Sequence, residues 1–310
     1  MTLPPRVTIV EVGPRDGLQN VPSVPGTAAK VRFIDRLSDA GLPVIEVGAF
    51  VDPRRVPAMA DSEAVVQAIT KRPGTRYTAL VPNLRGLARA AGSGLREVAV
   101  FGAASETFSR RNINQGITES FAGFRSVVEE AAVSGVRVRA YLSTAFGCPY
   151  EGDVPAARVA ELTDALLQVG AFEVAVSDTI GIAHPGQVWR VLDEVAARVP
   201  LARVALHFHD TRGTGLANVL AGLQAGVTTF DVSCGGLGGC PYAPGASGNL
   251  ATEDLVYMLD GLGIDTGVSL PGVVAASTFI ASHVPVDLPS RYLRAEQAVP
   301  RRSLRDSHDA

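Results

Sequence analysis

The chain has 310 residues, 46% of them hydrophobic, and a formal net charge of −3 at pH 7, which excludes the strongly basic surfaces typical of proteins that bind nucleic acid or anionic membranes. No apolar run approaches the roughly 20 residues that span a bilayer, and the chain shows no pattern of a secretory signal. Its three cysteines are an odd count, which indicates free thiols in a reducing compartment. We therefore expect a cytoplasmic protein whose partners include neither nucleic acid nor a membrane.

Short β-branched runs alternate along the chain with helical stretches, whose apolar residues recur every three or four positions. Several of these stretches end at a glycine, which readily takes the left-handed conformation that ends a helix. The runs expected as strands are residues 7–12, 44–47, 77–81, 98–101, 136–142, 173–176, 204–207 and 229–232. The glycines that end helical stretches are Gly41, Gly135, Gly170 and Gly226.

Eight strand–helix units predict a (β/α)₈ TIM barrel, since an open doubly wound sheet normally has fewer. The glycine-rich dinucleotide fingerprint of such open sheets is also missing after the first strand. We assign residues 1–285 to the barrel domain. From residue 286 the pattern is lost and the chain becomes polar, which predicts a short C-terminal tail, residues 286–310, lying on the barrel or on a neighbouring subunit.

Polar residues stand at or after the ends of the predicted strands, which is where TIM barrels carry their catalytic groups. In chain order they are Arg15, Asp16, Glu46, Asn83, Ser105, Asn112, Tyr141, Ser143, Asp178, His207, His209, Cys240 and Asn249. Ionisable groups from separate strands that meet on one rim predict an active site there.

The sequence His207-Phe208-His209 is the sharpest local signal, because residues two apart on a strand point to the same side. A single histidine is more often structural, but this pair at a strand end favours a metal site. Asp16 offers a carboxylate from the first strand, which adjoins the eighth in a closed barrel, and Asn249 offers an amide oxygen. Two nitrogens, two oxygens and open positions suit Mg²⁺ or Mn²⁺ better than a closed tetrahedral zinc site.

Glu46 stands within an apolar strand, and a buried carboxylate needs a partner. Arg15 is the natural partner, although Arg15 and Asp16 could also form only a surface ion pair. Cys148 and Cys234 are expected to be buried structural thiols.

Cys240 lies in the glycine-rich segment 235–242. The segment is either a turn that carries a thiol or a mobile flap that brings an acid or base over the metal.

Two long motifs resemble the signatures of the 3-hydroxy-3-methylglutaryl-CoA lyases. They are Val-Glu-Val-Gly-Pro-Arg-Asp-Gly-Leu-Gln-Asn at 10–20 and Gly-Leu-Gly-Gly-Cys-Pro-Tyr-Ala-Pro-Gly-Ala-Ser-Gly-Asn at 236–249. The resemblance extends to about Phe279 and includes residues 101–106 and 147–152. The first motif and the histidine pair are shared with Claisen-condensing isopropylmalate synthases, whereas the Cys240 segment is specific to the lyases.

This resemblance implies cleavage of 3-hydroxy-3-methylglutaryl-CoA into acetyl-CoA and acetoacetate, a step of leucine degradation, by an enzyme that acts on an acyl-CoA thioester. It implies a divalent cation, Mg²⁺ or Mn²⁺, and a homo-oligomer, either a dimer or a tetramer. The cation would be held by Asp16, His207, His209 and Asn249. The implied catalytic residues are Arg15, Glu46, Asp178 and Cys240. The implied substrate-binding residues are Gln19, Asn112, Tyr141 and Ser143.

The chain departs from the usual family pattern at Gly48, Ala175 and Arg212, among other positions. These changes remove hydroxyl groups and bulk near the expected substrate but keep the metal and acid–base groups. A longer branched 3-hydroxyglutaryl-CoA is therefore an alternative substrate. A Claisen synthase is a second alternative, although the chain after the barrel leaves no room for a regulatory domain, and a non-catalytic binding barrel is a third.

Overall fold

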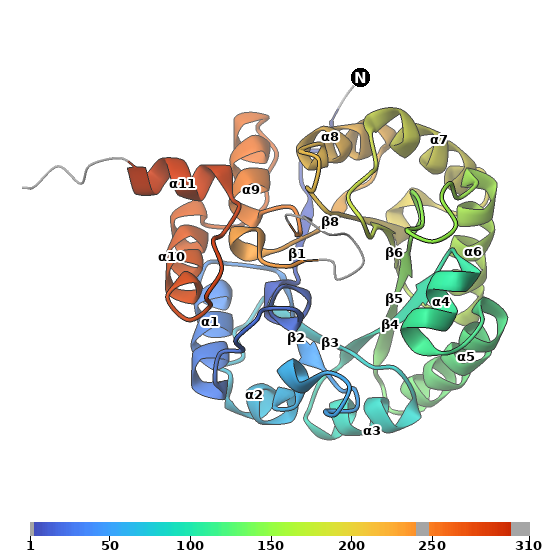
Figure 1. Ribbon diagram of the computed structural model, residues 1–310, viewed down its shortest axis with the longest axis horizontal. Helices are drawn as coiled ribbons and strands as arrows, with labels where there is room; N and C mark the ends of the chain where they lie inside the picture. Colours follow the sequence, from blue (N-terminus) through green and yellow to red (C-terminus); the bar gives the residue numbers. More distant parts are fainter. Residues whose placement is uncertain (1–2, 240–247, 299–310) are drawn as a thin grey trace, which may run out of the picture.

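The computed structural model describes residues 3–239 and 248–298. Its eight parallel strands form a closed barrel in sequence order, with β8 paired to β1, so the predicted TIM barrel is confirmed (Figure 1). The strands are β1 (Thr8–Glu11), β2 (Val44–Ala49), β3 (Arg76–Leu80), β4 (Glu97–Ala103), β5 (Arg137–Ser143), β6 (Val174–Asp178), β7 (Val204–Phe208) and β8 (Thr229–Val232). Each strand lies where the sequence predicts one, with bounds that differ by a few residues.

Helices surround the barrel, and α10 packs against α1 to complete the ring (Figure 1). The α-helices are α1 (Thr27–Asp39), α2 (Ser62–Ala68), α3 (Leu84–Gly92), α4 (Glu106–Ile113), α5 (Ile117–Val133), α6 (Ala156–Val169), α7 (Pro185–Ala196), α8 (Gly215–Ala225), α9 (Thr252–Gly261), α10 (Leu270–Ala281) and α11 (Arg291–Ala298). Four short turns are η1 (Gly13–Gly17), η2 (Pro57–Met59), η3 (Leu201–Arg203) and η4 (Cys234–Gly236). None of these helices is long and apolar enough to span a membrane.

Two of the glycines predicted to end helices show why glycine marks these positions. Gly170 ends α6 with φ of 114°, and Gly226 ends α8 with φ of 104°. A side chain at either position would be strained, since only glycine enters this region at little cost. The helices therefore end where the sequence predicts.

The two faces of the strands have different environments. Outward-facing apolar residues pack with the helices in one large core. Inside the barrel, Ala99, Ala175 and Ala205 pack around the ring of Tyr141. These three small side chains leave the volume that the large ring fills, so Tyr141 packs inside the barrel.

The tail predicted from residue 286 onward contains a helix, α11, that the sequence pattern did not reveal. Asp254 on α9 accepts hydrogen bonds from the Ser290 hydroxyl (2.8 Å) and from the backbone N–H of Tyr292 (2.8 Å). Leu288 and Leu293 are buried. The described part of the tail thus lies on the barrel, one of the two expected arrangements, while residues 299–310 lie outside the described part of the chain.

Candidate active site

The turn after β1 brings two functional side chains to the barrel mouth. In this π-helical turn, η1, the backbone N–H groups of Arg15 (3.1 Å), Asp16 (2.7 Å) and Gly17 (3.2 Å) all point at the carbonyl oxygen of Val12. Such turns are rare and occur frequently at functional sites. A Cβ atom at Gly17 would lie 2.9 Å from Leu237, so glycine lets the turn pack against the segment that follows η4.

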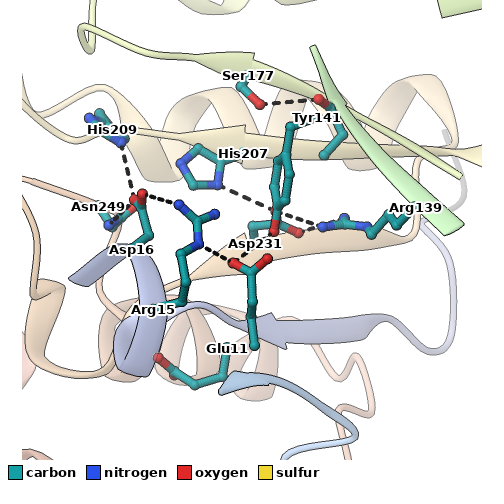
Figure 2. A network of polar contacts seen from close by, with 12 residues as sticks. Glu11, Arg15, Asp16, Arg139, Tyr141, Ser177, His207, His209, Asp231 and Asn249 are labelled. Carbon is teal, nitrogen blue, oxygen red and sulfur yellow. Dashed lines mark hydrogen bonds and ion pairs between the residues drawn. The ribbon is translucent and has the colours of Figure 1, made fainter. Parts of the chain in front are cut away.

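Arg15 connects three polar side chains within the barrel. Its Nε donates to Oε2 of Glu46 (2.5 Å), and its Nη1 donates to Oδ1 of Asp16 (2.6 Å). The hydroxyl of Tyr141 donates to the same Glu46 oxygen (3.3 Å), and the Arg15 guanidinium lies 5.3 Å from the Tyr141 ring centre (Figure 2). The predicted Arg15–Glu46 pair is confirmed. Because the Arg15 side chain is only 7% exposed, its contact with Asp16 is not a surface ion pair.

Burial and charge oppose each other in this network. Burial raises the pKa of Glu46 despite the nearby Arg15. Burial alone would lower the pKa of Arg15, but Glu46 and Asp16 raise it above its ordinary value. One Glu46 oxygen, Oε1, is buried and has no hydrogen-bond partner in the part of the chain that the structure describes. The site thus holds a fixed cation beside a carboxyl group with an unused oxygen.

A cluster that could hold a metal ion lies next to Arg15. Ligand atoms of Asp16, His207 and His209 all fall within 4.8 Å of one another. The bridge between His209 and Asn249 brings the fourth predicted ligand beside them. The Asn249 amide donates to Oδ2 of Asp16 (2.9 Å) and to the carbonyl of Leu237 (3.0 Å). Its Oδ1 is buried and has no hydrogen-bond partner among residues 3–239 and 248–298. The structure thus brings all four predicted ligands together and leaves this oxygen available within the described part of the chain.

The charge states also suit a divalent cation. Burial lowers the pKa of His209 to about 4, so the imidazole is neutral at pH 7 and keeps a lone pair. Burial would raise the pKa of Asp16, but Arg15 and the histidines lower it to about 2, so this carboxylate is ionised. Neutral imidazole and ionised carboxylate are the forms that bind metals. The residues present therefore fit a metal ion.

Asp178 ends β6 but is turned toward the chain that follows it. Its two carboxylate oxygens accept the backbone N–H groups of Ile182 (3.1 Å) and Ala183 (2.9 Å). Burial raises the pKa of Asp178 to about 6, and these hydrogen bonds only partly oppose the shift. A carboxyl group with such a pKa can take up or release a proton near neutral pH.

The four predicted substrate-binding residues come from β5, from the segment after η1 and from α4. Tyr141 belongs to the Arg15 network, and Ser143 lies two positions further along β5, buried and on the same face. Gln19 is half-buried just after η1. Asn112 lies on α4, the helix that follows β4. Cys240 lies outside the described residues.

Two polar residues of the predicted rim have structural roles. The side chain of Asn83 accepts the backbone N–H of Gly86 (3.0 Å) at the start of α3. Ser105 likewise accepts the N–H of Phe108 (3.2 Å) at the start of α4. Side chains of this kind are favoured at helix N-termini because they satisfy free N–H groups. The sequence alone does not distinguish such caps from functional residues.

Sequence reasoning missed a buried ion pair below the metal cluster. Arg139 on β5 donates through Nη1 (3.0 Å) and Nη2 (2.7 Å) to the two carboxylate oxygens of Asp231 on β8. Asp231 Oδ2 also lies 3.4 Å from Nδ1 of His207. The alternation Arg139, Tyr141, Ser143 places three polar residues on one strand face, and this was the available signal.

A second missed group lies behind η1. Glu11 accepts hydrogen bonds from the backbone N–H groups of Gly13 (2.8 Å) and Cys234 (2.9 Å) and from the Thr252 hydroxyl (2.6 Å). Glu253 accepts the N–H of Gly235 next to it. Burial raises the pKa of Glu11 to about 8 and that of Glu253 to about 7. These two carboxyl groups join β1, η4 and α9 beneath the site.

A closed parallel barrel with an Asp–His–His cluster beside a buried Arg–Glu pair at its rim defines a TIM-barrel enzyme of the metal-binding class. A family model described as HMGL-like matches residues 6–280, and the mitochondrial hydroxymethylglutaryl-CoA lyase of Rattus norvegicus is 54% identical over 279 residues, covering 90% of this chain and 86% of that protein. The chain belongs to the hydroxymethylglutaryl-CoA lyase family and is a carbon–carbon lyase.

Solved structures agree over almost the whole chain. The HMG-CoA lyase of Bacillus subtilis aligns with a TM-score of 0.94 at 49% identity, covering 96% of this chain and 100% of that one. An HMG-CoA lyase from Acinetobacter baumannii, solved in complex with coenzyme A and 3-methylmalate, aligns with a TM-score of 0.90 at 37% identity and covers 100% of both chains. The fold is thus shared with solved lyases.

Proposed function

We propose that this enzyme cleaves 3-hydroxy-3-methylglutaryl-CoA into acetyl-CoA and acetoacetate at the rim described above. Family membership supports the reaction, and the coenzyme A complex of the Acinetobacter baumannii relative supports an acyl-CoA thioester as substrate. The observation that carries the proposal is the Oδ1 of Asn249, which has no partner among the described residues. Asn249 lies beside the Asp16–His207–His209 cluster, within one network with Arg15.

The proposed cation ligands are Asp16, His207, His209 and Asn249, and the proposed cation is Mg²⁺ or Mn²⁺. The donor set of two imidazole nitrogens and two oxygens supports this choice over zinc. A bound divalent cation would make the tertiary hydroxyl of the substrate more acidic and would orient it.

Arg15 is proposed to stabilise the enolate oxygen that forms when the carbon–carbon bond breaks. Its guanidinium is held by Glu46 and Asp16 at 2.5 and 2.6 Å, so it need not reorganise as charge develops. Glu46 is proposed as the residue that holds Arg15 in place.

Two protons must move: one leaves the substrate hydroxyl, and one is added to the enolate carbon. We propose that Asp178 and Cys240 handle them. The pKa of Asp178, raised to about 6 by burial, supports a role in proton transfer. Cys240 is proposed from the family motif alone, because it lies outside the described residues.

Gln19, Asn112, Tyr141 and Ser143 are proposed to contact the substrate. Among the departures from the family pattern, Gly48 has a packing reason, since a Cβ there would lie 2.5 Å from the hydroxyl of Ser62 on α2.

Arg212 donates to the carbonyls of Ile180 (3.1 Å) and Gly181 (2.8 Å), which links two rim loops. Ala175 lies beside Tyr141 in the barrel interior, so it is the departure that could enlarge the substrate pocket. A longer branched acyl group therefore stays the second candidate.

The test is a coupled assay of a small panel of 3-hydroxy-3-alkylglutaryl-CoA thioesters, with and without added Mg²⁺ or Mn²⁺. We expect the 3-methyl compound to have the highest kcat/KM, and we expect chelation to abolish turnover. A preference for a longer alkyl group would replace the proposed substrate, and a protein that binds cation but cleaves none of the panel would be a binding barrel. Net condensation of acetyl-CoA with a 2-oxoacid would identify a synthase.

The place in leucine degradation, the cytoplasmic location and the homo-oligomer are further parts of this proposal. Cys148 and Cys234 are buried free thiols, which supports a reducing compartment. Light scattering after gel filtration tests for a dimer or tetramer, and cell fractionation tests the location.

A further inference from the structure

We infer that Asp231, held rigidly by Arg139, is a positioning residue that fixes the tautomer and the orientation of His207 toward the metal site. This inference rests on the proposed function, which makes His207 a metal ligand. It adds a layer of residues that the family motifs do not include.

The geometry begins with strand register. His207 on β7 and Asp231 on β8 are paired, so their side chains enter the barrel at the same level. Oδ2 of Asp231 lies 3.4 Å from Nδ1 of His207. The other ring nitrogen, Nε2, faces Asp16 and His209 (Figure 2). A contact with the carboxylate on one side thus leaves Nε2 for the cation.

Arg139 prevents the Asp231 carboxylate from turning away. It donates to both oxygens of Asp231, so rotation of the carboxylate would break two charge-assisted hydrogen bonds. The guanidinium is itself held by Glu173 (2.7 Å) and lies 5.1 Å from the Tyr141 ring centre. Arg139 is 1% exposed and Asp231 is 2% exposed. The pair therefore forms a fixed support under His207.

A metal-binding histidine needs such a support, because a neutral imidazole has two tautomers and only one leaves the lone pair on Nε2. An N–H from Nδ1 to a carboxylate selects that tautomer and fixes the ring plane. The neighbouring histidine provides a comparison, because Nδ1 of His209 is buried and no described residue forms a hydrogen bond with it. His209 contacts the Asp16 carboxylate through Nε2 (3.9 Å), whereas His207 faces a carboxylate through Nδ1.

The first measurement uses metal-free protein labelled with ¹⁵N-histidine. Long-range ¹H–¹⁵N spectra should show His207 as the Nδ1–H tautomer in the wild-type protein. Asp231→Asn should convert His207 to a tautomer mixture and leave the His209 signals close to their wild-type positions. A His207 spectrum unchanged by Asp231→Asn would overturn the inference.

The second measurement is Mn²⁺ affinity by electron paramagnetic resonance titration. Asp231→Asn should weaken Mn²⁺ binding about 10–100-fold, the usual effect of losing an outer partner of a metal-binding histidine. Arg139→Gln leaves the carboxylate opposite His207, so it should weaken Mn²⁺ binding less, although it also destabilises the fold. Glu97→Gln is the matched control, since Glu97 is a buried carboxylate paired with Arg76 (2.6 Å) and makes no described contact with the metal cluster. This control variant should leave the Mn²⁺ affinity unchanged.

The three variants separate positioning from simple destabilisation. If the loss of Mn²⁺ affinity follows the loss of unfolding free energy across all of them, the pair is only structural and the inference is wrong. Should Asp231→Asn not fold because Arg139 loses its partner, Asp231→Asn/Arg139→Gln removes both charges, and its His207 spectrum and Mn²⁺ affinity decide the question. A wild-type protein that binds no Mn²⁺ would contradict the proposed metal site, and the spectra would then still decide whether Asp231 orients His207.

Discussion

Asn249 donates a side-chain N–H to Oδ2 of Asp16 across 2.9 Å, although 233 residues separate the two along the chain. The second N–H of the same amide is used by the carbonyl of Leu237. With both hydrogens engaged, the orientation of the amide is fixed, and Oδ1 is the atom of this amide that has no hydrogen-bond partner among the described residues. The arrangement of the residues around Asn249 therefore decides whether the site can hold a cation.

Gly238 should be needed for this orientation. A Cβ at this position would lie 2.5 Å from Nδ2 of Asn249, and φ of Gly238 is 139°. We expect Gly238→Ala to displace the amide and to weaken Mn²⁺ binding, measured by equilibrium dialysis, by at least about 10-fold. Gly263→Ala is the control, because Gly263 also has a positive φ (71°) but a Cβ there would have no neighbouring atom within 4 Å. Equal effects of both changes would point to backbone strain alone.

Loss of a proposed ligand should abolish turnover while the barrel stays folded. We expect His207→Ala and Asp16→Ala each to weaken Mn²⁺ binding by more than about 100-fold. Changing a residue that only hydrogen-bonds to a metal ligand typically weakens binding by about 10–100-fold. Equilibrium dialysis, circular dichroism and the lyase assay measure the three properties. His184→Ala, an exposed histidine at the start of α7, should change none of them. Full activity of His207→Ala at low cation concentration would remove His207 from the ligand set.

Arg15→Lys should lower kcat by about 10²–10³-fold, the range seen when a donor to a developing oxyanion is lost. A lysine keeps the charge, but one ammonium group cannot reproduce the planar contacts with Glu46 and Asp16 at once. Steady-state kinetics separate the outcomes, since an effect confined to KM would indicate ground-state binding. Arg76→Lys, at the opposite end of the barrel, is the matched control.

Cys240→Ser should keep Mn²⁺ binding and lose about 10²–10⁴-fold in kcat, the usual range for a positioned acid or base. Alkylation followed by mass spectrometry should label Cys240 faster than Cys148 or Cys234. Both of these are buried, and burial raises the pKa of Cys234 above its ordinary value, which disfavours the reactive thiolate. If Cys240→Ser turns over like the wild type, the proton role passes to Asp178.

Stability should depend on pH through Glu11. Burial raises its pKa to about 8, against 4.5 in an unfolded chain. Between these values unfolding releases a proton, so rising pH lowers the free energy of unfolding by about 1.4 kcal/mol per pH unit. The contribution is full below pH 4.5 and is lost as the pH approaches 8.

The uncharged variant Glu11→Gln should lack this dependence, so its stability relative to wild type should increase from pH 5 to pH 8 in denaturant titrations. Glu151→Gln is the comparison. Burial by itself would raise the pKa of Glu151, but hydrogen bonds from Thr107 lower this pKa to below its ordinary value. Its difference from wild type should therefore be flat over the same range, and an equally flat difference for Glu11→Gln would contradict the prediction.

The barrel and its rim could be predicted from the sequence because their signals are local. Residues 229–232 predict a strand from their own composition, and Gly226 predicts the end of a helix because glycine readily takes the left-handed conformation. The His207–His209 pair was visible for the same reason, since two residues on one strand must share a face. The π-helical turn that directs Arg15 and Asp16 left no such periodic signal.

What could not be predicted depends on contacts between distant segments. In the sequence, Asp231 is one acidic residue within an apolar run. Its role is visible only in the folded barrel, where β8 places it against Arg139 of β5. Glu11 is likewise explained only by η4 and α9. The caps at Asn83 and Ser105 resemble functional residues because the same side chains serve both purposes.

The barrel seam between β1 and β8 runs through the proposed cation site. Asp16 follows β1 on one side of this seam, while His207, His209 and Asn249 come from the other side. A chain in which the first and last strands have not yet paired has only part of the ligand set, so tight cation binding is a property of the closed ring. Because an ion that binds only the closed form stabilises it by mass action, cation occupancy would report ring closure during folding. During synthesis on the ribosome, 233 further residues must be added after Asp16 before its partner Asn249 is present.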